Sequence, residues 1–221
     1  MRRLMVAVLA VLSLAGHAQS VHIELGAGQT YYHPQSDGIW YQLGAPHRLD
    51  THGDTYLLGL TGDVWTKEHV GVAWHADYVD LGHLSAWCEC TTDDNYDYST
   101  HAARQAGIAG GTFDGSGRVH GLQAAIEPYV AWGDVRIGYQ YGLVRFQPTW
   151  RETVYAWPSP EGPPLTVYAN TPRAYRWGHL YGVSVSSGRA SLVYTHYTLP
   201  TPWPTPALYT GADTLMFVWR F

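Results

Sequence analysis

The chain ends in Leu215-Met216-Phe217-Val218-Trp219-Arg220-Phe221, and this stretch decides the class of fold. Every second residue in it is large and apolar, namely Leu215, Phe217, Trp219 and Phe221. Because successive side chains of a β-strand point to opposite sides, these four share one face. An uninterrupted apolar face that ends in an aromatic residue favours a sheet whose outer side contacts lipid. The alternative is a core-facing edge strand of a soluble β-sandwich.

Residues 1–18 have the features of a secretory signal peptide. Arg2 and Arg3 form a basic start, residues 4–14 are mostly apolar, and Gly16-His17-Ala18 provides small residues for cleavage. The apolar run is too short to cross a bilayer as a helix. We therefore expect an exported mature protein of residues 19–221 that forms one domain.

The composition excludes some partners and fits a membrane barrel. Without Arg2 and Arg3 the chain has 11 basic residues against 18 acidic ones, which argues against nucleic acid as a partner. The 10 Trp and 17 Tyr are numerous enough to form aromatic belts at membrane boundaries. A mean hydropathy of −0.19 is no objection, because a barrel hides its apolar residues in alternation.

Alternating segments recur along the chain and predict eight strands. They are residues 21–32, 55–64, 70–79, 122–130, 135–143, 175–186, 190–198 and 214–221. The connections between them alternate regularly between long and short. This order predicts an all-β fold, an eight-stranded antiparallel up-and-down transmembrane β-barrel with short periplasmic turns and four long extracellular loops. Ten strands is the alternative if residues 106–113 pair with the stretch before His120, and an Ig-like or jelly-roll sandwich is another.

The terminal strand resembles that of bacterial outer-membrane barrels, whose final aromatic residue is read by the barrel-assembly machinery. The resemblance makes Leu215, Phe217, Trp219 and Phe221 the expected assembly signal. Residues 19–221 as a whole resemble small outer-membrane barrels of the outer-membrane protein A and X type. This implies an outer-membrane location, contact with lipid and lipopolysaccharide, and a monomer. The stretch Val72-Ala73-Trp74-His75-Ala76-Asp77-Tyr78 also resembles prophage-encoded barrels of Burkholderia-type bacteria.

Charged residues on the polar parity predict an ion-pair network inside the barrel. The expected members are Glu24, His75, Asp77, Glu127, Arg136, Arg176 and Arg220, with Asp63 and His22 on the same parity. Eight strands enclose an interior that side chains just fill, and an unpaired buried charge is costly. The alternative interpretation of the same residues is a narrow gated pore.

Other candidate sites are weaker. Cys88 and Cys90 would form a tight disulfide in an oxidising compartment, and a metal clamp with His83 is the alternative. Asp93, Asn95 and Asp97 imitate the start of a calcium loop, but the glycine and the closing glutamate that such a loop needs are missing. The 12 histidines show no i, i+4 pair, so we expect single histidines, no metal site and no cofactor.

An enzymatic alternative rests on His196-Tyr197-Thr198. This stretch resembles the His-x-Ser of lipid A deacylase barrels, in which the catalytic residues face lipid near the outer leaflet. The resemblance would make His196 the base and Thr198 the nucleophile. The serine of that family is a threonine here, and residues 200–214 contain only Asp213 as an acid.

The expected function is therefore a non-enzymatic outer-membrane barrel that displays its loops for surface interaction or envelope integrity. The loops are rich in aromatic residues for protein or glycan contact: Trp40, Tyr41, Trp87, Tyr96, Trp150, Tyr155, Trp157 and Trp203. Arginines in the same loops would meet lipopolysaccharide phosphates or simply keep the loops soluble: Arg48, Arg104, Arg118, Arg151 and Arg173.

Overall fold

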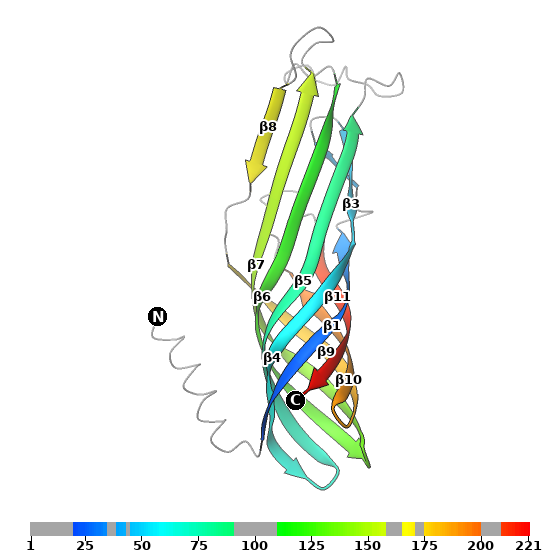
Figure 1. Cartoon of the computed structure of the whole chain (residues 1–221), viewed down its shortest axis with the longest axis vertical. Coiled ribbons are helices and arrows are strands. Elements are labelled where there is room, and N and C mark those ends of the chain that lie inside the picture. Colours follow the sequence, from blue (N-terminus) through cyan, green and yellow to red (C-terminus); the bar gives the residue numbers. More distant parts are fainter. Residues whose placement is uncertain are drawn as a thin grey trace, which may run out of the picture.

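The computed structural model describes residues 20–34, 39–42, 45–90, 110–157, 165–170, 175–199 and 209–221, and it is a closed antiparallel β-barrel (Figure 1). The barrel strands are β1 (Val21–Pro34), β4 (His52–Lys67), β5 (Val70–Cys90), β6 (Gly110–Trp132), β7 (Val135–Trp157), β9 (Arg176–Ser187), β10 (Ala190–Thr198) and β11 (Tyr209–Arg220). Each pairs with its two neighbours, and the pairing of β1 with β11 joins the two ends of the chain. The predicted eight-stranded up-and-down barrel is confirmed. The predicted signal peptide lies outside the described residues.

Connections of two residues join strands at one end of the barrel, called here the turn end. They follow β4, β6 and β9, as predicted from the sequence. Gly133 and Gly188 have φ values of 58° and 57°, a left-handed conformation that glycine adopts without a steric cost. Glu68 makes the third turn with φ 47° despite its side chain. The strand ends that the longer connections join are at the opposite end, called here the loop end.

The last strand has the two faces that its sequence predicts. Leu215, Phe217 and Trp219 are 53%, 54% and 41% exposed on the outside of β11. Met216 and Val218 are buried inside the barrel, between these outward residues. Its register with β1 and β10 is continuous through all of these residues. The predicted alternation of outward apolar and inward side chains is therefore confirmed for residues 215–219.

Three barrel strands continue far beyond the loop end, which corrects the predicted loop boundaries. The sequence predicts no barrel strand between residues 79 and 122 or between residues 143 and 175, but β5, β6 and β7 remain paired as far as Cys90, Gly110 and Trp157. Shorter strands flank this projecting sheet: β2 (Ile39–Gln42) and β3 (Ala45–Asp50) beside β5, and β8 (Leu165–Asn170) beside β7. Figure 1 shows the sheet rising above the barrel. Residues 110–113 belong to β6, so the ten-strand alternative is wrong.

A bulge in β5 marks where the strand leaves the barrel. The register with β6 shifts between Asp80 and His83, and Gly82 has a φ of 85°. Val79 is buried before the bulge and Leu84 after it, so the inward parity changes from odd to even residues. The buried Tyr32 hydroxyl donates to the Leu81 carbonyl over 2.9 Å and fixes the bulge to β1. This change of phase is the reason that strict alternation appeared to end at residue 79.

The barrel interior differs between its two ends. At the loop end it is filled by large apolar side chains, among them Tyr32, Leu84, Phe146, Leu180 and Tyr197. At the turn end it holds buried carboxylates, His75 and two arginines. Trp150 is only 5% exposed within the apolar cluster, so its predicted place at a loop tip is wrong. In the described residues, no helix is both long enough and apolar enough to cross a membrane.

Candidate functional sites

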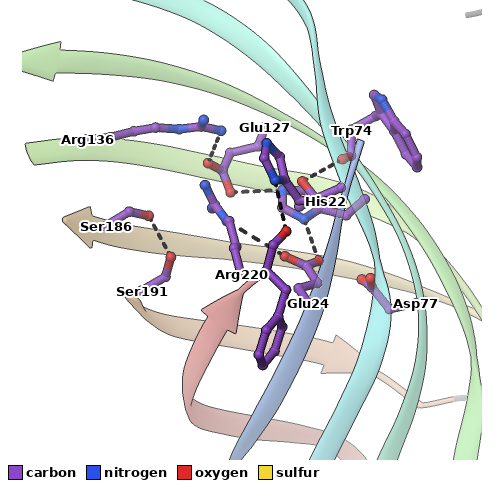
Figure 2. Close-up of polar contacts among 12 residues, drawn as sticks. His22, Glu24, Trp74, Asp77, Glu127, Arg136, Ser186, Ser191 and Arg220 are labelled. Carbon is purple, nitrogen blue, oxygen red and sulfur yellow. Dashed lines mark hydrogen bonds and ion pairs between the residues drawn. The ribbon is translucent and has the colours of Figure 1, made fainter. Parts of the chain in front are cut away.

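A chain of buried ionisable groups crosses the interior at the turn end. The His75 Nδ1 atom lies 2.9 Å from Glu24 Oε1, and its Nε2 atom lies 3.2 Å from Glu127 Oε2. All three residues are at most 5% exposed. A neutral imidazole can donate from only one nitrogen, so the doubly protonated ring is the form that donates to both carboxylates. Figure 2 shows Glu127 beside Arg136 and Glu24 beside Arg220.

Glu127 is the most heavily bonded member of the network. Besides His75, it accepts from Arg136 Nη2 over 2.9 Å and from Gln140 Nε2 over 2.8 Å. The Arg136 Nη1 atom reaches Asp63 over 3.3 Å, and the guanidinium lies 3.5 Å from the centre of the Tyr129 ring. Glu127 is fully buried, and charge-assisted bonds of this kind offset the cost of removing its charge from water.

The other predicted members of the interior network differ in how closely they join it. The Arg220 Nε atom lies 3.9 Å from Glu24 Oε2, and Gln123 Nε2 donates to Asp77 over 2.8 Å. Both carboxylates line a small interior pocket with His75. Arg176, by contrast, is exposed near the loop end of β9 and has no carboxylate partner among the described residues. His22 contacts Ser20 and the Phe221 carbonyl instead of a network carboxylate. The structure therefore groups the predicted residues except Arg176 and His22.

Two glycines leave the space that the buried carboxylates occupy. Gly59 is directly opposite Asp77, and a Cβ at Gly59 would collide with the Asp77 carboxylate. A Cβ at Gly138 would lie 2.6 Å from Glu127 Cγ and Cδ. These glycines permit close approach rather than an unusual backbone conformation.

The outer wall is an apolar belt. Between 42% and 66% of each belt residue is exposed: Ile23, Leu25, Tyr56, Leu58, Leu60, Tyr78, Leu122, Ile126, Ile137, Tyr139, Leu143, Val183, Val185, Leu192, Leu215 and Phe217. Large aromatic residues are exposed beside the belt at both ends, with Trp65 and Trp132 at the turn end and Tyr175 and Trp177 at the loop end. Such a band between two aromatic levels is typical of a wall in contact with lipid.

A polar rim ends the belt at the loop end. On its strand, each member lies two residues nearer the loop end than an exposed apolar or aromatic residue. The members are Asp54, His120, Arg145, His179, His196 and Asp213. The Arg145 guanidinium lies 4.3 Å from the centre of the Tyr175 ring. His179 and His120 contact Tyr141 and Tyr78, respectively. The rim therefore combines aromatic rings with polar heads, as residues at a membrane–water boundary do.

The rim contains a three-residue cluster on the outer faces of β1, β11 and β10. The His196 Nδ1 atom lies 2.6 Å from Asp213 Oδ1, and His33 Nε2 lies 2.8 Å from Asp213 Oδ2. The two imidazole rings are 5.5 Å apart, and Gly211, opposite His33, has no side chain to separate them. The prediction that the histidines lie singly is therefore wrong for His33 and His196. No sequence spacing indicated this cluster, since β1 is far from β10 and β11 in the chain.

The pair expected for catalysis is only partly assembled. His196 has an acid partner in Asp213, the one acid that the downstream sequence contains. The Thr198 hydroxyl, however, accepts from the His179 amide over 2.9 Å and donates to the His179 carbonyl over 3.3 Å. Thr198 therefore directs its proton to the backbone of β9 rather than to His196.

The two cysteines and the acidic loop give no further site. β5 runs through Cys88 and Cys90, but their side chains lie outside the described part of the structure, so the disulfide stays a prediction. Asp93, Asn95 and Asp97 lie outside it as well. The described candidate sites are thus the interior network and the rim cluster.

Together the fold and its two surfaces define a closed eight-stranded antiparallel barrel, apolar outside and ion-paired inside. No family model and no curated protein matches the chain. Among solved structures it is similar to the attachment invasion locus protein, Ail, of Yersinia pestis in complex with the heparin analogue sucrose octasulfate. This match has 12% identity and a TM-score of 0.39, and covers 91% of this chain and 97% of Ail.

The backbone structure of the same Yersinia pestis outer membrane protein in a phospholipid bilayer nanodisc also matches. It has 11% identity and a TM-score of 0.33, and the match covers 91% of this chain and 100% of that one. Neither match decides what this chain binds or does. The likenesses to prophage-encoded barrels and to lipid A deacylases stay predictions.

Proposed function

We propose that this protein is an outer-membrane β-barrel without catalytic function, which displays an extracellular surface for interaction or envelope integrity. The observation that supports it is the inversion of a soluble fold: apolar side chains cover the outside and charged ones are buried within. In water, a continuous apolar belt around a barrel would aggregate, whereas in a bilayer it is the stable surface. The polar rim and the loop end then face outward, and the two-residue turns face the periplasm.

The projecting sheet is the proposed display surface. β5, β6 and β7 carry paired backbone beyond the rim, and the polar outward residues Ser116, Arg118 and Thr149 suit water rather than lipid. Arg118 forms an ion pair with Asp80 at the base of this sheet. This ion pair favours a structural role for Arg118 over binding lipopolysaccharide phosphates. Outer-membrane lipid, lipopolysaccharide and the barrel-assembly machinery remain the proposed partners, and the barrel is proposed to act as a monomer.

Location and display require separate experiments. Membrane fractionation should recover the processed chain with the outer membrane, and folded protein should migrate differently on gels before and after boiling. Recovery as a dissolved periplasmic protein would contradict the proposal. For display, residues 91–109 and residues 158–164 would each be replaced by a two-residue turn, with the interior variant Ser191→Ala as a folded control. Loss of cell adhesion, phage sensitivity or serum survival in a loop variant, but not in the control, would identify the interaction.

A lipid A-modifying enzyme that uses His196 and Thr198 is the second candidate. The contact between His196 and Asp213 favours it, because an acid beside a histidine orients a catalytic base. The bonds of Thr198 to His179 oppose it. Mass spectra of lipid A from cells that express the protein test this candidate. An acyl chain that is lost with the wild type and retained with His196→Ala would establish the enzyme.

A further inference from the structure

The rim cluster is held rigidly by three neighbouring strands. Asp213 on β11 is directly opposite Tyr31 on β1 and His196 on β10, while His33 is opposite Gly211. Backbone pairing continues on both sides of Asp213 and His196, and His33 is the last residue of β1 before its register with β11 shifts. The Tyr181 ring lies 4.7 Å from the His196 ring and limits its movement on the far side. The cluster is therefore built into the barrel wall.

The donor atoms of the cluster converge. One nitrogen from each histidine and one Asp213 oxygen all lie within 4.8 Å of one another. The His33 Nε2 atom is covered from solvent and makes no hydrogen bond, although it lies 2.8 Å from Asp213 Oδ2. This nitrogen forms an ion pair with the Asp213 carboxylate but is out of line for a hydrogen bond to it. A cation bound between the two groups would satisfy both of them.

We propose that His33, His196 and Asp213 bind a divalent transition-metal ion of the zinc class. Two imidazoles and one carboxylate suit Zn²⁺, whose bonds to nitrogen and oxygen are about 2.0–2.2 Å long. Tetrahedral ligation would place neighbouring donor atoms about 3.3 Å apart, so the 2.8 Å and 2.6 Å contacts of Asp213 would open by about 0.5–0.7 Å. Movement of this size needs only side-chain rotation.

The site is open on its outer side. His33 and Asp213 retain 37% and 24% of their side-chain exposure, and the chain supplies only three ligands among its described residues. A fourth position would thus be left for water or for an oxygen of a neighbouring lipid headgroup. A metal on His196 would also withdraw that imidazole from use as a free base, which separates this proposal from the enzymatic candidate.

Metal binding to the refolded barrel in detergent tests the proposal directly. After treatment with a chelator, Zn²⁺ titration by calorimetry should show about one equivalent bound. Co²⁺ should give the visible absorption of a four- or five-coordinate ion rather than that of the hydrated ion. His33→Ala, His196→Ala and Asp213→Asn should each weaken binding at least about 100-fold, the upper end of what losing an outer-shell partner costs. Gel mobility before and after boiling verifies that every variant is folded.

His179→Ala is the matched control, because it removes a histidine of the same rim that has no contact with Asp213 among the described residues. It should bind Zn²⁺ as the wild type does. The interior residues Glu24, His75 and Asp77 also lie within 4.8 Å of one another, and all the cluster variants leave them unchanged. Binding that survives in folded His33→Ala and His196→Ala, or a wild type that binds no metal, would overturn the proposal.

Discussion

Replacing Glu127 by Gln should destabilise the barrel more than any change to an exposed acid. The substitution keeps the shape of the side chain and removes its charge. Glu127 accepts three bonds, at 3.2 Å from His75, 2.9 Å from Arg136 and 2.8 Å from Gln140. Breaking one partner of a buried ion pair typically costs about 3–5 kcal/mol, because the opposite charge is left uncompensated.

The ion-pair partners that His75 and Arg136 keep after the loss of the Glu127 charge narrow the expected range of about 3–5 kcal/mol. His75 keeps Glu24 at 2.9 Å, and Arg136 keeps Asp63 at 3.3 Å, so neither cation is left alone. We therefore expect a loss near the lower limit, about 3 kcal/mol in the free energy of unfolding. Arg136→Gln should have a similar effect, and the double variant should lose less than the sum of the two, as residues in direct contact do.

Reversible denaturant unfolding of the barrel in lipid vesicles, followed by tryptophan fluorescence, measures these changes. Asp134→Asn is the control, because Asp134 is exposed in the turn before Arg136 and should change stability by at most about 0.5 kcal/mol. A Glu127→Gln variant within about 1 kcal/mol of the wild type would refute the reasoning. So would strict additivity with Arg136→Gln.

Three further outcomes follow from the same structure. Phe217→Arg, in the belt, should lower the free energy of unfolding in vesicles by about 2–4 kcal/mol. His179→Arg, on the rim, should lower it by only about 0–1 kcal/mol, and equal effects of the two variants would contradict the proposed position of the bilayer. Gly59→Ala should cost about 1–3 kcal/mol in the same assay, because its Cβ collides with Asp77, and an unchanged stability would refute the close approach. Because side chains fill the interior, planar bilayers should show no single-channel steps for the wild type or for Glu127→Gln, and steps in the wild type would support the pore interpretation.

Sequence patterns predicted the barrel strands wherever one face meets lipid. There the outward residues are large and apolar, as on β11, so the period of two is visible. Above the rim this contrast is lost. On β6 the outward Ser116 and Arg118 alternate with inward Gly115 and Gly117, a composition that indicates a loop although every residue is paired.

The interior network was predictable to a large extent because parity alone places a charged side chain inside or outside. Arg176 shows the limit, since it lies at the start of β9, where the structure leaves it exposed. The rim cluster was not predictable in the same way. It depends on the register between β1 and β11, which brings His33 next to residues about 180 positions later in the chain. Parity places each residue on a face but does not say which residues of other strands lie beside it.

The 23-residue length of β7 has a mechanical consequence. Such a strand measures about 75 Å, whereas crossing the hydrocarbon layer takes about 9–11 residues. Roughly half of its length therefore extends beyond the bilayer, as a hydrogen-bonded β-sheet that is stiffer than an unpaired chain would be. A molecule held at its tip would be kept at a set height above the cell, and shortening the ribbon by an even number of residues in β6 and β7 together would lower that height in steps.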